Sequence, residues 1–376
     1  MKAVQGKELG DIDEMLTVED NIEVPKLNDL TPKQRKTRIL IRTEAVALAC
    51  GDARVLSGRT RELQGPPSFP YIPGGDAAGI VVEIPEEAAL QAADDDNTFP
   101  FQVGDRVAAR FVDGPRGALG EYAIVDTRVC EKIPDNISSP EGAALASAAP
   151  AMLLAERIQK GERVLIMGAG GGVGSHAAQI MRNQQGASYL VGVSRNPELL
   201  LKAPLNYDKA IDYTQQDPFA IEEFKENPFD VVVDLAGGSW LRLVQDVKSG
   251  ERSIVKPASQ GGRYLTLTPD QALFDAHGMA DVLKPFLFIP LWRAIKSRLW
   301  GRRRLPKYTF AMSLDAERSH LTRTMTMAKT GKLTAQIDPQ GPFPMTTEGV
   351  RKAFHLQESR HINGKVIITV SRDEKE

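Results

Sequence analysis

The apolar and polar positions of this chain follow two different patterns, and the change falls at about residue 139. Before that point, short apolar runs alternate with polar residues and are separated by turns rich in Pro and Gly. The alternation predicts strands at 37–43, 80–84, 103–107 (a turn that leads into a strand) and 121–125. Because few stretches there have helical spacing, we expect the first part of the chain to be built mainly of strands.

Beyond residue 139, near-continuous apolar runs alternate with stretches of helical length. An alanine-rich helix is predicted at 140–158, and strands are predicted at 163–167, 189–193, 209–212, 230–235 and 263–267, with an edge strand at 307–312. Apolar strands separated by helices indicate a parallel sheet covered on both faces. In the tail, helices are predicted at 316–329 and 347–358, and a last strand at 365–370.

The composition excludes several classes of protein. Of 376 residues, 47 are Lys or Arg and 49 are Asp or Glu, so a net charge of −2 provides no basic field for nucleic acid. Cys50 and Cys130 are the only cysteines, too few for a disulfide scaffold or a four-cysteine zinc site. No apolar run reaches the length of a bilayer span, and no signal-peptide pattern opens the chain. We therefore expect a soluble protein in the cytoplasm.

A glycine-rich loop joins the first predicted parallel strand to the helix after it. Residues 164–167 lead directly into Gly168-Ala-Gly-Gly-Gly-Val-Gly174, and 175–183 have helical spacing. Such a loop brings backbone N–H groups and the positive end of a helix up to a pyrophosphate. The spacing is a G-x-x-G-x-x-G variant of the dinucleotide fingerprint. We predict a dinucleotide site at Gly168, Gly171, Gly172, Val173 and Gly174.

The end of the second parallel strand indicates which dinucleotide is bound. Proteins that bind NAD place an acidic residue about 20 residues beyond the loop, where it holds the ribose hydroxyls. Here the corresponding residues are Ser194 and Arg195, with no carboxylate. A hydroxyl and a guanidinium suit the 2′-phosphate of NADPH, which a carboxylate would repel. The sequence therefore favours NADPH over NADH.

These features together resemble the medium-chain dehydrogenase/reductase superfamily, closest to its zinc-free, quinone oxidoreductase-like branch. The matching segments follow one another through most of the chain: Asp52 with Gly58, 70–79 (PYIPGGDAAG), 103–107 (VGDRV), 120–123 (GEYA), the glycine loop, 211–213 (IDY), 229–238 (FDVVVDLAGG), 262–264 (GRY) and 364–366 (GKV). The resemblance implies an α/β fold. A GroES-like, β-rich catalytic domain would comprise 1–139 and 316–376, and a Rossmann doubly wound parallel-sheet domain would comprise 140–315, with the active cleft between them.

The resemblance also implies roles for residues outside the glycine loop. Tyr213 would lie near the adenosine phosphate, and Ala236 and Asn363 near the nicotinamide half of the cofactor. Related proteins are often homodimers that pair through the edge of the Rossmann sheet, where 307–312 is predicted. We therefore expect a homodimer.

The positions that hold zinc in alcohol dehydrogenases of this superfamily carry other residues here. The Gly-His-Glu segment of those enzymes corresponds to Gly74-Gly75-Asp76, and their cysteine ligand to Ala49. No cysteine occurs beyond Cys130, so the third ligand is missing too. A zinc site needs three or four converging ligands, so we predict no metal. Cys50, one place after Ala49, is better interpreted as a small buried apolar residue.

Without a metal, the easiest chemistry is hydride transfer to an electron-poor acceptor. A quinone or an α,β-unsaturated carbonyl compound accepts hydride at carbon while negative charge spreads onto oxygen. We therefore predict an NADPH-dependent reductase of small lipophilic quinones or enones. The tyrosine that some enoyl-thioester reductases of the superfamily use is absent, so fatty enoyl-CoA reduction loses support. Candidates for the catalytic group are Asp52, Tyr71 and Cys50.

Two other functions stay open. An alcohol or aldehyde oxidoreductase with an atypical site would be supported by stoichiometric zinc. A non-catalytic NADPH-binding sensor or partner protein would be supported by tight NADPH binding without turnover.

One segment, at about 282–306, is both basic and strongly apolar. Phe288, Trp292, Ile295 and Leu299 share one helical face, and no acidic residue occurs between Asp281 and Asp315. A basic amphipathic helix with tryptophan is typical of segments that lie on an anionic membrane, which would make 286–304 a peripheral membrane contact. The alternative is an inserted helical pair that covers the cleft or packs against a second subunit.

Overall fold

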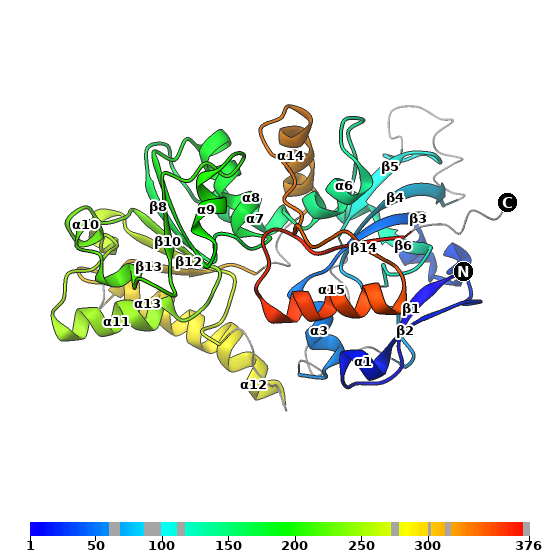
Figure 1. Cartoon of the computed structure of the whole chain (residues 1–376), viewed down its shortest axis with the longest axis horizontal. Coiled ribbons are helices and arrows are strands. Elements are labelled where there is room, and N and C mark those ends of the chain that lie inside the picture. Colours follow the sequence, from blue (N-terminus) through cyan, green and yellow to red (C-terminus); the bar gives the residue numbers. More distant parts are fainter. Residues whose placement is uncertain are drawn as a thin grey trace. The chain divides into compact units, whose positions relative to one another are not determined.

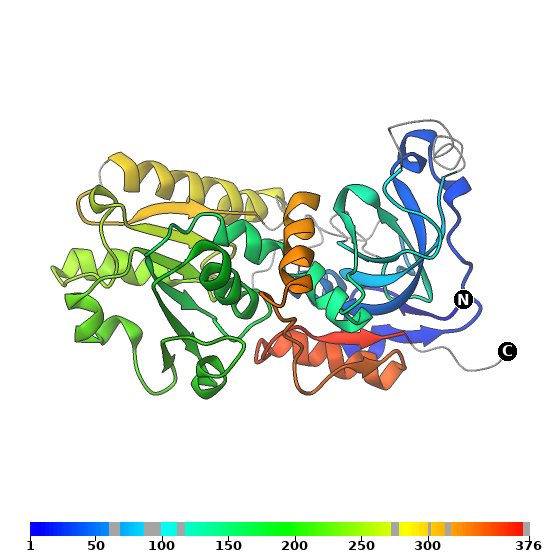
Figure 2. The ribbon, with the colours of Figure 1, turned by 90° about the horizontal axis from the view of Figure 1, so that it is seen from above.

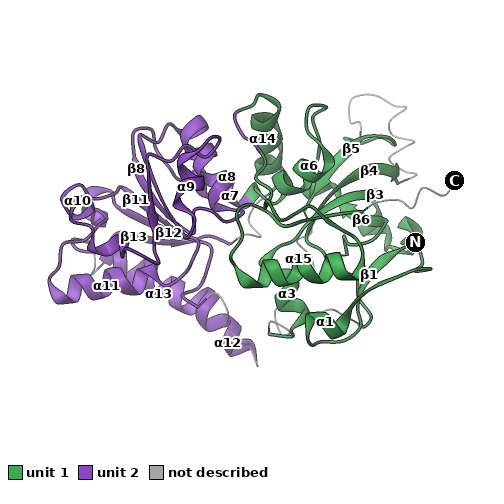
Figure 3. Ribbon diagram, in the orientation of Figure 1, with its two compact units in different colours: residues 1–149, 317–331, 335–376 green, residues 150–316, 332–334 purple. Residues whose placement is uncertain are grey.

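The computed structural model describes residues 1–59, 68–85, 99–110, 117–271, 278–299, 302–312 and 317–370. The chain forms two compact units (Figure 3). Unit 1 comprises 1–149, 317–331 and 335–376, and unit 2 comprises 150–316 and 332–334. The first boundary therefore follows residue 149, whereas the sequence places it after 139. The other predicted boundary, at 315/316, lies outside the described residues.

A seven-stranded sheet forms the centre of the described part of unit 1 (Figure 1). Its order is β14-β15-β3-β4-β5-β7, and β6 also pairs with β3. The bounds are β3 (Arg38–Ala47), β4 (Asp76–Glu83), β5 (Arg106–Ala109), β6 (Tyr122–Asp126), β7 (Cys130–Lys132), β14 (Phe343–Pro344) and β15 (Ile367–Thr369). A separate pair is formed by β1 (Ala3–Gly6) and β2 (Leu16–Glu19). The predicted strands are present, and β4 begins four residues earlier than the sequence indicates, at Asp76.

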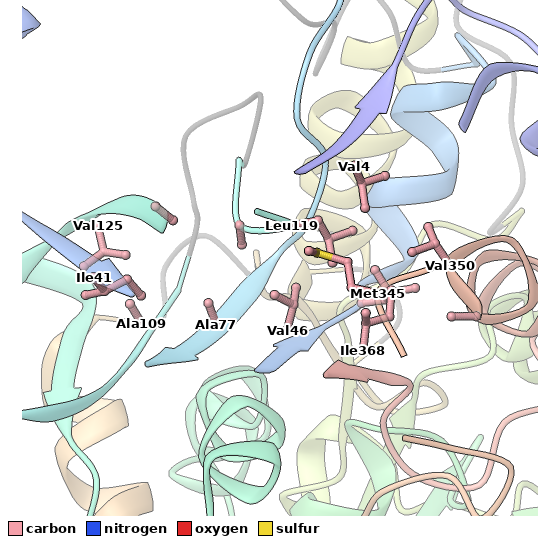
Figure 4. Packing of buried hydrophobic residues seen from close by; sticks show 14 of the residues in the cluster. Val4, Ile41, Val46, Ala77, Ala109, Leu119, Val125, Met345, Val350 and Ile368 are labelled. Atoms are coloured by element: carbon pink, nitrogen blue, oxygen red, sulfur yellow. The ribbon is translucent and has the colours of Figure 1, made fainter. Parts of the chain in front are cut away.

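Among the described residues of unit 1, the helices are short except for two near the C-terminus. They are α1 (Ile12–Met15), α2 (Pro32–Arg35), α3 (Cys50–Leu56), α6 (Ser139–Ala146), α14 (Arg318–Lys329) and α15 (Thr347–Ser359). The core is built from strand residues that alternate inward, joined by one face of α15. Figure 4 shows Ile41 and Val46 of β3, Ala77 of β4 and Ile368 of β15 gathered with Val350 of α15, all buried.

The alanine-rich stretch predicted as one helix at 140–158 forms two helices. The first, α6, ends at Ala146, and α7 (Ala149–Ala155) begins after a two-residue turn. Pro150 explains the break, since it has no N–H to donate to the carbonyl of Ala146 in a continuous helix. The prediction of a single helix was wrong, and the break leaves Ser147 in the turn.

Unit 2 contains a six-stranded parallel sheet in the order β10-β9-β8-β11-β12-β13. The strands are β8 (Arg163–Met167), β9 (Tyr189–Ser194), β10 (Lys209–Asp212), β11 (Val231–Asp234), β12 (Arg263–Thr266) and β13 (Lys307–Phe310). In chain order this is 3-2-1-4-5-6, the order of the doubly wound dinucleotide-binding fold. The direction of winding reverses between β8 and β11, and the predicted Rossmann sheet is confirmed.

Helices follow most strands of unit 2. They are α8 (Gly174–Ile180) with the π-helical turn Met181–Gln185, α9 (Pro197–Leu201), α10 (Glu222–Glu226), α11 (Ser239–Ser249), α12 (Met279–Leu283) and α13 (Ile289–Leu299). Right-handed crossovers on either side of the reversal carry successive helices to opposite faces of the sheet. Figure 2 shows α12 and α13 (yellow) alongside β13, against which α13 packs.

Candidate cofactor and active site

The glycine loop lies at the carboxyl end of β8, where the strand order reverses. Gly168 has a φ of +80°, a conformation that strains any other residue. A Cβ atom on Gly174 would lie 2.5 Å from the carbonyl oxygen of Gly168, so only glycine fits. The nearest atom to a Cβ on Gly171 would be 3.6 Å away. The loop is therefore tightly folded at both ends and open at Gly171.

The loop is fixed to the first turn of α8 by a buried histidine. The Nδ1–H of His176 donates to the carbonyl of Gly172 at 2.6 Å, and Val173 is the N-terminal cap residue. The first N–H groups of a helix have no partner within it and carry partial positive charge. The end of β8 therefore presents backbone donors suited to a phosphate.

One buried carboxylate shapes the loop after β11. Asp234 is fully buried and accepts hydrogen bonds from the N–H groups of Ala236 (3.0 Å), Gly237 (2.8 Å) and Ser239 (3.0 Å) and from the hydroxyl of Tyr264. A Cβ atom on Gly168 would be 3.5 Å from the nitrogen of Ala236. Ala236 therefore lies directly beside the glycine loop, at the same edge of the sheet.

The structure also brings together the two residues predicted for the adenosine end. Arg195 follows β9, Tyr213 follows β10, and the guanidinium donates to the tyrosine hydroxyl at 3.5 Å. Both side chains are exposed, Tyr213 by 49%. Ser194 is nearly buried, and its Oγ accepts the N–H of Asn196 at 3.3 Å. A cationic and an aromatic side chain thus face solvent together beside the glycine loop.

A carboxylate at the end of β10 is already engaged. Asp212 Oδ1 accepts the N–H of Thr214 at 2.9 Å and its hydroxyl at 2.7 Å. The side chain therefore stabilises its own turn.

Asn363, which the resemblance places near the nicotinamide, lies in unit 1. Its N–H donates to Asp338 Oδ2 at 2.7 Å, and Asp338 is buried. The next residue, Gly364, has a φ of +108°, and a Cβ atom there would lie 2.7 Å from the carbonyl oxygen of Gln336. This turn fixes the backbone that leads into Lys365.

Unit 1 contains a buried polar cluster that joins residues from four distant segments. Asp76 accepts a hydrogen bond from Ser147 Oγ at 2.5 Å and lies 3.9 Å from Arg110 Nε. The charge of Asp76 also acts on Lys365. All four side chains are buried. Such a concentration of charge inside a domain is typical of a functional site.

Lys365 stands out within this cluster. Its ammonium has no hydrogen-bond or ion-pair partner among the residues that the structure describes. Burial lowers its pKa below the ordinary 10.5, and the negative charge of Asp76 only partly opposes this effect. A buried lysine without a fixed partner can be neutral or protonated according to what is placed beside it.

The three predicted catalytic candidates lie in unit 1 and differ in their surroundings. Asp52 is buried, and its Oδ2 accepts the N–H of Ala49 at 2.7 Å, so it holds the start of α3. Cys50 is exposed, which corrects the interpretation of it as a buried apolar residue. As the first residue of α3 it faces outward, and Gln357 Nε2 approaches its sulfur at 3.4 Å.

Tyr71 is almost completely buried. Its hydroxyl has no hydrogen-bond partner among the described residues. Burial, reinforced by the negative charge of Asp52, raises the pKa of Tyr71 well above its ordinary value. The ring also fills the space beside Gly6, where a Cβ atom would come within 2.4 Å of it. Tyr71 is therefore a packing residue that keeps its proton.

Comparison with known proteins agrees with this architecture. Residues 35–135 match the alcohol dehydrogenase GroES-like domain family, and residues 205–368 match the zinc-binding dehydrogenase family. The chain belongs to the medium-chain dehydrogenase/reductase superfamily, in its quinone oxidoreductase-like branch. The predicted family and α/β fold are confirmed, and the protein is an oxidoreductase of this superfamily.

Named relatives cover nearly the whole chain. It is 27% identical over 373 residues to the NADPH-dependent alkenal/one oxidoreductase, chloroplastic, of Arabidopsis thaliana, covering 98% of this chain and 79% of the relative. It is 28% identical over 378 residues to the 2-methylene-furan-3-one reductase of Solanum lycopersicum, with the same two coverages. Escherichia coli quinone oxidoreductase complexed with NADPH has a similar fold, with a TM-score of 0.66 and 20% identity over 98% of this chain and 100% of that one.

The described residues contain no group of three or more His, Cys, Asp or Glu side chains that could hold a metal ion. Where other members of the superfamily have zinc ligands, this chain places Gly75 and Ala49. Likewise, no helix within the described ranges is long and apolar enough to cross a membrane.

Sequence reasoning missed the cluster around Lys365. In the sequence, the Gly-Lys-Val segment at 364–366 indicates only the resemblance to the superfamily, and Asp76 only a departure from the zinc motif. One signal was available: a lysine followed by the apolar run 366–368 is a charge at the start of a buried strand. Ser147 and Arg110 carry no comparable local signal.

Proposed function

We propose that this protein is an NADPH-dependent, metal-independent oxidoreductase that transfers hydride to a quinone or an α,β-unsaturated carbonyl compound. The observation that carries the proposal is the pairing of Arg195 with Tyr213 beside the glycine loop, without a free carboxylate at the end of β9. The names of two relatives, an NADPH-dependent alkenal/one oxidoreductase and a 2-methylene-furan-3-one reductase, support the acceptor class.

The residues at the end of the sheet fit NADPH. The open position at Gly171 and the donors at the start of α8 suit a pyrophosphate. Arg195 would bind the 2′-phosphate, and the exposed ring of Tyr213 would pack against the adenosine. When bound, NADPH supplies a hydride.

The remaining task is to stabilise the negative charge that develops on the acceptor oxygen. A protonated Lys365 suits this role, because it is buried and its ammonium is not committed to another group in the described structure. The hydride would go to the β-carbon of an enone, or to the ring of a quinone. The negative charge on oxygen would be held by Lys365 until a proton arrives. Asp76 would favour the protonated form of the lysine.

The first test is a turnover assay with purified protein, NADPH or NADH, and a panel of quinones, enones and aldehydes, with and without a chelator. We expect NADPH oxidation with quinones or enones, unchanged by the chelator. Activity only with aldehydes or alcohols and dependent on zinc would contradict the proposal. Tight NADPH binding without turnover on any acceptor would identify a sensor or binding protein instead.

A further inference from the structure

The segment from α12 to α13 forms one continuous helical rod from Met279 to Leu299, in which residues 284–288 are π-helical. One side of this rod already faces the core of unit 2. Pro290 and Ser297 are buried there, and Ser297 Oγ accepts the N–H of Tyr308 in β13 at 3.1 Å. Phe286 packs edge-on against Phe310 of β13. The rod is therefore held to the sheet by a side that does not include its apolar stripe.

A half-buried ion pair adds to this attachment. Arg293 donates from Nη1 and Nη2 to the two carboxylate oxygens of Asp270, at 2.8 and 2.5 Å, and its side chain is only 12% exposed. Of the basic residues in the segment, Arg293 is thus committed to the structure. The rod has little freedom to rotate and bury its other side.

The opposite side of the rod is an apolar stripe that faces solvent. Its members are Leu287 (49% exposed), Phe288 (58%), Leu291 (54%), Trp292 (57%), Ile295 (37%) and Leu299 (67%). Soluble domains rarely leave so many large apolar side chains contiguous on one element. The stripe is therefore a surface for binding.

The charges around the stripe select its partner. Exposed basic residues lie in and just after the rod: Lys284, Lys296, Arg298, Arg302, Arg303, Arg304 and Lys307. The sequence from 282 to 314 contains no acidic residue to balance them. A second copy of the chain placed against the stripe would bring two sets of these cations together, and their repulsion would oppose pairing. An anionic surface neutralises them.

We infer that the rod is a membrane-binding element, which lies flat on an anionic lipid bilayer with its apolar stripe in the headgroup and acyl-chain boundary. Helices of this kind bury their apolar side about 5–10 Å deep, while flanking Lys and Arg contact lipid phosphates. Trp292 and Phe288 then occupy the interface that aromatic rings prefer. The inference does not depend on the proposed reaction.

The experiment is co-sedimentation of the full chain with vesicles of phosphatidylcholine containing about one third phosphatidylserine. We expect binding at low salt, little binding to pure phosphatidylcholine, and release at about 0.5 M salt because the charges are screened. Absence of the protein from the vesicle pellet at low salt would overturn the inference.

Two pairs of variants locate the surface. F288S/L291S should weaken binding about tenfold or more, whereas L241S on α11, whose leucine is 53% exposed, should not change it. R298E should weaken binding about fivefold or more, and K248E, also on α11, much less. Equal effects of a rod variant and its control would contradict the assignment.

Two further readouts keep the result interpretable. All variants should keep the melting temperature of the parent, because the substituted side chains are exposed. Activity on a short, water-soluble enone should also be unchanged in F288S/L291S, so failure of the proposed reaction would not affect this test. If sedimentation without lipid shows a dimer that F288S/L291S dissociates, and no vesicle binding occurs, the stripe is a subunit interface and the inference is wrong.

Discussion

The glycine-loop edge of unit 2 and the polar cluster of unit 1 are built in opposite ways. At the edge of unit 2, the main chain provides the donors, and a few glycines and the buried Asp234 fix its path. In unit 1, side chains from segments far apart in sequence provide the charges, centred on Asp76 and Lys365. The first arrangement rests on the path of the main chain, whereas the second depends directly on the protonation of Lys365. This difference can be tested by substitution.

The largest effect is expected for D234A, which removes one acceptor from three backbone N–H groups and the hydroxyl of Tyr264. Buried donors left without an acceptor should lower the free energy of unfolding by about 3–5 kcal/mol. Urea denaturation measures this loss. The control is D212A, which removes a half-buried turn carboxylate and should cost about 1 kcal/mol or less. Similar losses in both variants would show that Asp234 does not organise this edge.

The next effect concerns catalysis in unit 1. K365M should lower kcat/KM for an enone or quinone about 100-fold, as expected when one charged donor to a developing oxyanion is lost. K365R keeps the positive charge and should recover part of this loss. The dissociation constant for NADPH, measured by fluorescence, separates this role from cofactor binding. If K365M weakens NADPH binding and leaves kcat unchanged, the lysine contacts the cofactor and not the acceptor.

A smaller effect is expected for Arg195, the residue that we propose binds the 2′-phosphate of NADPH. R195A should raise the KM for NADPH about 10–30-fold and leave the KM for NADH nearly unchanged, because only NADPH carries the 2′-phosphate. Initial rates with the two cofactors measure the ratio. R252A, which removes an exposed arginine elsewhere in unit 2, is the matched control. Equal loss with NADPH and NADH would contradict the assigned role.

The smallest effect is a dependence of stability on pH that arises from Lys365 in the cluster of unit 1. The pKa of Lys365 is lower in the folded protein than the 10.5 of an unfolded chain, so the unfolded state binds more protons between these values. The stability of the parent protein relative to K365M should therefore rise with pH up to about 10.5 and be lowest below the folded pKa. Urea denaturation between about pH 7 and pH 10 tests the sign. A relative stability that falls with pH would show that Lys365 is protonated more readily in the folded state.

The same contrast explains what could be predicted from sequence. Gly168 to Gly174 are consecutive, and the strand and helix that flank them have clear periodicity, so the glycine loop can be identified locally. Arg195 and Tyr213 end neighbouring parallel strands, and their meeting follows from the sheet order. Asp76, Ser147 and Lys365 meet only because an antiparallel sheet and the turn before Pro150 bring them together. No local pattern records such a meeting, so the cluster was missed.

The sequence pattern also does not predict which individual residues are buried. Cys50 is small and apolar, yet as the first residue of α3 it faces outward. The apolar stripe of the rod at Met279–Leu299 has the spacing of an amphipathic helix. This spacing predicts correctly that Phe288, Trp292, Ile295 and Leu299 lie on one side of the rod. The spacing does not reveal that other residues, such as Ser297 and Arg293, hold the rod to the sheet.

The central position of β3 has a consequence for synthesis on the ribosome. Residues 45–47 of this strand pair with 367–369 of β15, the last strand among the described residues. While the nascent chain emerges, unit 2 can complete its parallel sheet, but this edge of β3 lacks its partner until residues 367–369 have been synthesised. An exposed strand edge invites pairing with other chains. Truncation before residue 365 should therefore yield a protein in which unit 2 folds and unit 1 recruits chaperones or aggregates.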